Sequence, residues 1–533
     1  MRKLSIAYVL ISIVSLSVSN ANNVTVSNVN FDGNTTITFD LSWENSWRTS
    51  TTQPYNYDGV WIFVKVRNCY EKNLGSPSAF AHVWLDTNPA NHSATNSVPG
   101  GEALTIEMGT TDVAATPRGM GIFLYQTNDV TEATDISTSV TLEWDRATQA
   151  ATMAAINDTS NYDVKVFAVE MVYVPQGAFY LGDGASSQCF HDVTGGTTVP
   201  FYVDSEESFT VSGAINRACD STSVTGNPID ANYPKGYDAF WIMKYEISQY
   251  QYAEFLNTLT QDQAENRTTD ELFTMTTKMY VMSNNAGVVS RQGIALDPQG
   301  DKRTDIFQLD LNANNTYNET SGDGLGIACN YLSLRDVLAY LDWAALRPLT
   351  EMEYEKACRG LLYPQVNEYA WGSVAITDAQ FPINSGNPDE QAYGSGNGLC
   401  NYMNTTGGPL RVGFAATSST NRVQAGCSYY GVMELSGNVA EPYMSFYNDA
   451  NNSNDFEGQP GDGELDSDGY QDVTGWPSHI GDADFQMFLN KGGAWDWNNA
   501  VYNRVSRRNE EANYDNDTYV SVRDNSFGGR GGR

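Results

Sequence analysis

The stretch GDGELDSDGYQD, residues 461–472, carries closely spaced carboxylates of the kind that bind calcium. Five of its residues approximate positions 1, 3, 5, 6 and 9 of an EF-hand loop: Glu464, Asp466, Asp468, Gly469 and Asp472. Position 12 falls on Gly475 instead of glutamate, and position 1 is glutamate instead of aspartate. We therefore favour a solvated acidic loop and keep calcium binding by Asp466, Asp468 and Asp472 as the alternative.

Cysteine and histidine show no metal-binding spacing. The seven cysteines are scattered without a CxxC pair, which argues against a zinc ribbon or a thioredoxin-like site. Their odd number leaves at least one without an intramolecular disulfide. His82 and His92 stand in or near predicted loops, and we do not expect them to bind a metal. A carboxylate pair could run a hydrolysis, but no spacing singles one out.

The net charge narrows the range of partners. Acidic residues outnumber basic ones by 64 to 30, which gives a formal charge of −34. Such a chain is repelled by nucleic acid and by anionic membrane surfaces, so we expect neither as a partner. Calcium and cationic or neutral polar ligands are compatible with this charge.

The first residues predict export. A basic start, Met1-Arg2-Lys3, is followed by an apolar run of about fifteen residues and by small residues that offer cleavage after Ala21. Residues 1–21 are therefore a predicted signal peptide. The alternative, a membrane anchor, is short for a bilayer span and lacks charges on its far side. We expect a secreted or cell-surface protein without membrane insertion.

Short strands fill the region from residue 22 to 168. In TITFDLSW, apolar and polar residues alternate from Ile37 to Trp43, and VWIFVKV (60–66) is a more continuously buried run. Similar runs end at Trp144 and near Ala168, and stretches rich in Asn, Thr, Ser, Gly and Pro separate them. This pattern predicts a β-sandwich over residues 22–168.

Helices appear among turns from residue 169 onward. Capping boxes start two predicted helices, at Ser248 and Thr350, and Ser333 is the predicted N-cap of a helix between them; Gly360 ends the last of the three. Their apolar stripes are predicted to be core. Residues 169–533 are thus expected to form a second domain, of mixed α+β class with much irregular structure.

The ordered motifs of this second region resemble the formylglycine-generating enzyme (sulfatase-modifying factor) family. They are MVYVPQGAFYLGDG, FWIMKYEISQYQYAEFLN, RPLTEMEYEKACRG, YAWG, GVMELSGNVAEP, NKGGAWDW and FGGRGGR. The resemblance covers about 360 residues, leaves out the N-terminal region and implies a fold related to C-type lectins.

In the same alignment, the family's catalytic positions fall on residues that cannot carry out its chemistry. The two cysteines that hold copper(I) in its oxidase members fall on Trp497 and Tyr502, and the active-site serine falls on Ala494. Neither Trp nor Tyr holds copper(I) as a thiolate does. The family's iron-dependent branch uses three histidines, whereas this region has only His191 and His479. We expect neither copper nor iron.

Calcium is the cofactor that the resemblance still implies. Carried over position by position, the family's SGNV loop gives the ligands Glu434, Gly437, Val439 and Glu441. A turn kept only for packing is the alternative. Asn401 and the carbonyl of Tyr402 resemble part of the family's other calcium site, although no matching carboxylate follows them. Carboxylates and backbone carbonyls are ligands that calcium prefers.

The C-terminal segment from Asp496 to Asn525 is rich in Asn, Tyr, Asp and Arg, a composition that suits a binding surface. In the family and its lectin relatives, the equivalent surface lines the ligand groove. Trp497, Tyr502 and Arg504 are the predicted ligand-binding residues, and Trp495 is predicted to be core.

These observations predict an exported, non-catalytic structural or binding protein that self-assembles into a homo-oligomer or fibre at or outside the cell surface. One alternative is a monomer that binds a surface glycan or protein through the former active-site groove. The other is a residual enzyme of unrecognised chemistry.

Overall fold

The computed structural model describes residues 23–69, 78–96, 101–111, 117–153, 156–157, 161–185, 190–194, 197–210, 228–268, 272–298, 306–445, 456–476, 488–508 and 521–533. The predicted signal peptide and His479 lie outside the described residues, as does the stretch 509–520 of the C-terminal segment. None of the described helices has the length and apolar character needed to cross a membrane.

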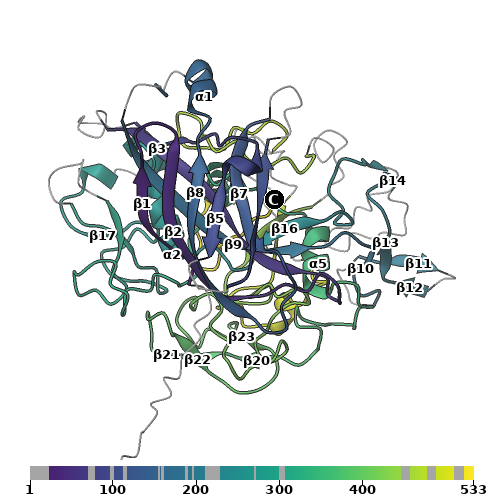
Figure 1. Cartoon of the computed structure of the whole chain (residues 1–533). Coiled ribbons are helices and arrows are strands. Elements are labelled where there is room, and N and C mark those ends of the chain that lie inside the picture. Colours follow the sequence, from purple (N-terminus) through teal and green to yellow (C-terminus); the bar gives the residue numbers. More distant parts are fainter. Residues whose placement is uncertain are drawn as a thin grey trace, which may run out of the picture.

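Two antiparallel sheets form the predicted β-sandwich (Figure 1). The first has the order β1 (Thr25–Phe31), β2 (Thr36–Ser46), β8 (Thr134–Glu143), β5 (Ser93–Asn96). The second has the order β16 (Phe240–Met243), β9 (Tyr162–Val174), β3 (Tyr57–Asn68), β7 (Gly119–Gln126), β6 (Leu104–Thr110), with β4 (Ala81–His82) also paired to β3. Helix α1 (Arg146–Thr152) follows β8.

Alternation of side chains builds the core between the sheets. Ile37, Phe39 and Leu41 of β2 are buried in one cluster with Val60 and Ile62 of β3, as the sequence pattern predicts. The intervening residues of β3, among them Trp61 and Phe63, belong to a second core formed with the rest of the chain. Strand β3 is therefore buried on both faces, which explains its continuously apolar sequence.

Strand β9 joins the sandwich to the region that follows. It pairs with β3 from Tyr162 to Tyr173 on one side, and with β16 from Met171 to Val174 on the other. The predicted boundary between residues 168 and 169 falls inside this strand, so a division there would cut it in two.

The rest of the chain is the predicted mixed α+β region, with short helices and small sheets. Its helices are α2 (Gln249–Leu256), α3 (Gln261–Asn266), α4 (Leu334–Trp343) and α5 (Glu351–Arg359), and its 3-10 turns span Leu272–Thr274 and Ala500–Asn503, while a further 3-10 turn, Pro89–Asn91, belongs to the sandwich. Capping boxes start α2, α4 and α5 at Ser248, Ser333 and Thr350, and α5 ends at Gly360 with φ +62°. The predicted caps of the three helices and the end at Gly360 are confirmed, and the box that Asp336 completes at Ser333 was not predicted.

The small sheets are mostly two-stranded and antiparallel. They pair β10 (Phe179–Leu181) with β13 (Phe201–Val203), β11 (Asp192–Thr194) with β12 (Thr197–Val199), β14 (Phe209–Thr210) with β15 (Pro228–Ile229), β21 (Gln380–Ile383) with β22 (Gln391–Tyr393), and β24 (Glu441–Met444) with β25 (Phe488–Lys491). β17 (Met279–Tyr280), β18 (Ile294–Leu296) and β19 (Phe307–Leu309) form a three-stranded sheet, and β20 (Thr377–Asp378) pairs in parallel with β23 (Leu399–Cys400).

The last residues of the chain are packed inside the molecule, where Figure 1 marks the C-terminus. Arg533 and Trp241 exchange two backbone hydrogen bonds, of 2.8 and 2.9 Å. A Cβ on Gly532 would lie 2.5 Å from Leu349 Cδ2, so the tail reaches this position only with glycine there. The buried Arg530 guanidinium donates to the Glu441 carboxylate over 2.6–2.8 Å.

Replacing Arg530 tests how far this ion pair holds the tail in place. Arg530→Met leaves the Glu441 carboxylate buried without its cation, and we expect a loss of about 3–5 kcal/mol in the free energy of unfolding, measured by urea denaturation. The control Lys165→Met removes the half-exposed Lys165–Glu254 pair and should cost less than about 1 kcal/mol. Equal losses in the two variants would contradict this account.

Candidate metal centre and ligand surface

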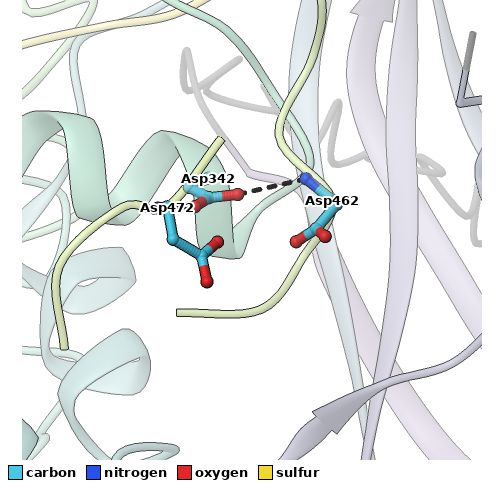
Figure 2. Close-up of side chains that lie close together, drawn as sticks. All are labelled: Asp342, Asp462 and Asp472. Carbon is cyan, nitrogen blue, oxygen red and sulfur yellow. Dashed lines mark hydrogen bonds between the residues drawn. The ribbon is translucent and has the colours of Figure 1, made fainter. Parts of the chain in front are cut away.

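Three aspartates come together beside the end of helix α4. Asp342 lies in the last turn of the helix and is fully buried, while Asp462 and Asp472 belong to the loop 461–472. Figure 2 shows the three side chains side by side. Carboxylate oxygens from the three lie within 4.8 Å of one another, so the cluster could hold a metal ion.

Backbone hydrogen bonds fix the loop against the helix. The N–H groups of Asp462 and Asp472 donate to the two oxygens of Asp342 over 3.1 and 3.2 Å, and the first of these bonds is drawn in Figure 2. Gly461 packs so closely that a Cβ would lie 2.5 Å from Asp342 Cα. A larger residue at 461 would therefore push the loop away from the helix.

The loop also contacts the sandwich. Lys65 of β3 donates to the carbonyl of Gly463, and the backbone N–H of His82 in β4 donates to Glu464 over 2.6 Å. A Cβ on Gly463 would lie 2.3 Å from the His82 ring. The cluster therefore lies where the sandwich, helix α4 and the acidic loop meet.

The acidic groups around Asp342 are buried with too little positive charge nearby to balance them. It raises the pKa of Asp342 well above its usual range, and Asp462 raises it further. Burial also raises the pKa of Glu464 to about 7 and lowers that of Lys65 to about 8. Asp342 additionally stands near the negative end of the α4 dipole. A bound cation would favour the ionised forms of Asp342 and Glu464 and so offset the cost of burying these carboxylates.

The donor chemistry fits a hard cation such as calcium. The three aspartates supply only oxygen ligands, and calcium takes several oxygens in flexible geometry. Asp342, Asp462 and Asp472 would hold the ion directly, while Glu464 stands close enough to be raised in pKa by Asp462 and Asp472. A calcium ion bound there would hold the loop to the helix electrostatically.

The aspartates that form the cluster differ from the residues that an EF-hand alignment would choose as calcium ligands. Asp466 accepts hydrogen bonds from the N–H groups of Asp468 and Tyr470 over 2.9 and 2.8 Å, so it closes its own turn. Asp468 is exposed. Of the three aspartates named in the alternative, only Asp472 belongs to the cluster, and Asp342 and Asp462 were not predicted.

The predicted SGNV-loop ligands lie close together, but protein groups engage their carboxylates. Glu434 accepts the N–H of Gly413 over 3.0 Å, and burial raises its pKa to about 7. Glu441 is held by Arg530 and by the Tyr443 hydroxyl at 2.6 Å. The carbonyls of Gly437 and Val439 accept no hydrogen bond from another described residue. Calcium binding here stays a prediction.

Asn401 fits a structural role as well as the predicted calcium role. Its side chain donates to the Gly408 carbonyl and to Asn438, and accepts from the Thr406 hydroxyl. These bonds tie the loop after β23 to the SGNV loop. The neighbouring Tyr402 is half-buried, and its predicted carbonyl ligand also stays a prediction.

The predicted ligand-binding residues lie on a half-buried surface next to the turn 500–503. The rings of Trp497 and Tyr502 meet edge to face with centroids 5.5 Å apart. Burial raises the pKa of Tyr369, and the charge of the nearby Arg504 guanidinium opposes this rise. Trp495 is buried, as expected, and donates to the Asn525 carbonyl over 2.8 Å.

A single thiol is packed beneath this surface in the described part of the chain. Cys400 is buried and donates to the Ser436 carbonyl over 3.2 Å, with Asn503 at 3.7 Å. Burial raises its pKa well above the usual range, so it stays a protonated thiol instead of a thiolate.

Comparison with known proteins identifies most of the chain. The model of a family described as the sulfatase-modifying factor enzyme 1-like domain (FGE-sulfatase) matches residues 159–523. No curated protein matches the sequence. A solved structure from work on pH-induced modulation of Streptococcus parasanguinis adhesion by Fap1 fimbriae aligns with 34% of this chain and 83% of its own, at 12% identity. The TM-score of 0.13 is too low to indicate a shared fold.

The aspartate cluster predicts a calcium-dependent gain in stability. At a hundredfold excess of calcium over its Kd, we expect about 2.7 kcal/mol more unfolding free energy than in chelator. Asp462→Asn should remove most of this gain, while the matched variant Asp468→Asn, an exposed aspartate of the same loop, should keep it. Calorimetric titration and urea unfolding measure both quantities. A gain that survives Asp462→Asn would place the ion elsewhere.

The raised pKa values predict an inverted pH dependence without metal. A carboxyl with a raised folded-state pKa, such as Glu464 at about 7, keeps a proton that the unfolded chain has already lost. In chelator, the Tm should therefore fall between about pH 5 and about pH 7.5. Calcium needs ionised ligands, so it should raise the Tm at the upper pH and have little effect at the lower one. A calcium effect equal at both pH values would contradict this mechanism.

Proposed function

Because the chain belongs to the family of sulfatase-modifying factor enzyme 1-like domains over residues 159–523, we propose that it keeps the scaffold of this family without its oxidase chemistry. Its function is structural: an exported, calcium-stabilised protein whose copies associate at or outside the cell surface. The observation that supports a loss of catalysis is the edge-to-face contact of Trp497 and Tyr502, the two residues that the resemblance aligns with the family's copper-binding cysteines.

The donor set at this surface does not fit copper(I). The resemblance puts aromatic rings at both thiolate positions, and the thiol of Cys400 beneath them is buried and protonated. Copper(I) selects soft sulfur ligands and needs them deprotonated. We therefore propose no copper-dependent catalysis for this chain.

Exposed apolar side chains support self-association. The hairpin of β21 and β22 presents Phe381, Ile383 and Tyr393, which are 66%, 43% and 65% exposed. Aromatic residues gathered on a two-stranded hairpin, with unpaired strand edges beside them, are typical of a contact surface. An extracellular setting would also supply the calcium that the aspartate cluster fits.

A glycan- or protein-binding monomer is the second candidate. Trp497 and Tyr502 remain partly exposed beside Arg504, and aromatic residues with arginine make good anchors for a ligand. In this version, the protein stays small in solution and saturates with a ligand at that surface.

Light scattering with negative-stain microscopy tests the structural role. We expect ordered assemblies of the chain from residue 22 in calcium, and their dissolution in chelator. The variant Phe381→Ser/Tyr393→Ser should lower assembly at least about tenfold at equal concentration, because the contact loses its apolar burial. Ile306→Ser is the control, since Ile306 is 47% exposed outside the hairpin. A calcium-indifferent monomer would reject self-assembly and favour the second candidate.

A further inference from the structure

A cavity of about 540 Å³ lies between the open edge of the sandwich and helix α2. Strands β1 and β9 form one wall, and the first turns of α2 with parts of the loops 320–326 and 386–388 form the other. None of the described residues that line it belongs to the aspartate cluster or to the surface around Trp497. Its volume is typical of ligand sites.

The cavity runs along the backbone edge of β9 instead of one of its faces. A face of a strand contributes every second residue, because successive side chains point to opposite sides. Here seven consecutive residues, 164–170, line the cavity. The sheet order explains this, because β9 is paired with β3 along its length but meets β16 only from Met171 onward.

Unpaired peptide groups face this open edge. The Glu170 carbonyl accepts the N–H of Lys244, the residue that follows β16, so the peptide groups of Glu170 point away from β3. Because this direction alternates along an antiparallel strand, the N–H and C=O groups of Val164, Val166 and Ala168 point the same way. No hydrogen bond from another described residue reaches them on that side.

Two buried polar side chains that line the cavity also lack hydrogen bonds. Both carboxylate oxygens of Glu170 and the Nε1–H of Trp343 are buried without a hydrogen-bond partner among the described residues. Each such group costs about 1–3 kcal/mol relative to a satisfied one. These atoms have almost no accessible surface, so they lie just beneath the cavity lining, and Glu170 meets only the Lys244 ammonium, at 3.8 Å.

The charge around Glu170 is negative. Glu170 and Asp58 share one ammonium group, that of Lys244, at 3.8 and 3.7 Å. Burial raises the pKa of Glu170 to about 7 and that of Asp58 to about 6, against the pull of Lys244. A second cation beside Glu170 would balance the pair.

We propose that this cavity binds an extended peptide that adds to β9 as a strand, in line with β16, and directs a lysine or arginine side chain to Glu170. The peptide backbone supplies the alternating N–H and C=O groups that the open edge of β9 needs. Its other face meets Tyr340 and Trp343, which line the opposite flank, so apolar side chains fit there. This site is independent of the proposed self-association.

Selection from a displayed library of random heptapeptides against the whole chain tests the site. Two variants remove single contacts. Glu170→Gln deletes the charge, and Val166→Pro deletes an edge N–H while sparing the β3 ladder, because that N–H points away from β3. Glu457→Gln, an exposed glutamate, is the matched control. We expect enriched peptides to carry Lys or Arg and to lose at least about tenfold in affinity for both variants.

Hydrogen exchange gives a second readout that does not depend on either variant. Bound peptide should slow amide exchange at Val164, Val166 and Ala168. Failure to enrich any peptide, equal affinity for Glu170→Gln, or unchanged exchange at these amides would overturn the proposal. If Val166→Pro does not fold, the Glu170→Gln affinity and the exchange data decide.

Discussion

The pairing of β3 with β9 supports both halves of this molecule. One face of β3 fills the sandwich core through Val60 and Ile62, while the other face carries Trp61 and Phe63 into the core shared with helix α4. β9 follows β3 along its length and then receives β16. Because β3 is buried on both faces, the sandwich cannot shift without disturbing the packing around α4.

Buried charge is the second constraint, and the chain meets it in different ways. Arg530 neutralises Glu441 through a forked contact that also anchors the C-terminal tail. Around Asp342 the balance is incomplete, since Lys65 is the cation that opposes Glu464 and the aspartates. Around Glu170, one ammonium serves two carboxylates. At the last two places an outside cation, metal or side chain, would balance the excess negative charge.

Local signals correctly predicted strands β2, β3, β8 and β9 and helices α2, α4 and α5, whereas many of the short strands were not predicted. Alternation in 37–43 and the helix caps at Ser248 and Ser333 depend on neighbours within a few residues, so the sequence contains them. The aspartate cluster needs Asp342 and Asp462, which are separated by 120 positions and joined by tertiary packing. An EF-hand template drew attention to the loop but chose Asp466 and Asp468. Asp462 stands two residues before Glu464 in GDGE, and this close spacing of acidic residues was the available signal for it.

The long ladder between β3 and β9 also sets how the molecule would respond to pulling. Twelve residue pairs connect the two strands, from Tyr57–Tyr173 to Asn68–Tyr162. A tension applied along these strands would strain the whole ladder in shear, with its hydrogen bonds loaded together instead of being unzipped one by one. A chain held at the sandwich and loaded through its larger region would therefore resist extension at β9, which gives this strand a mechanical importance beyond its place in the sheet.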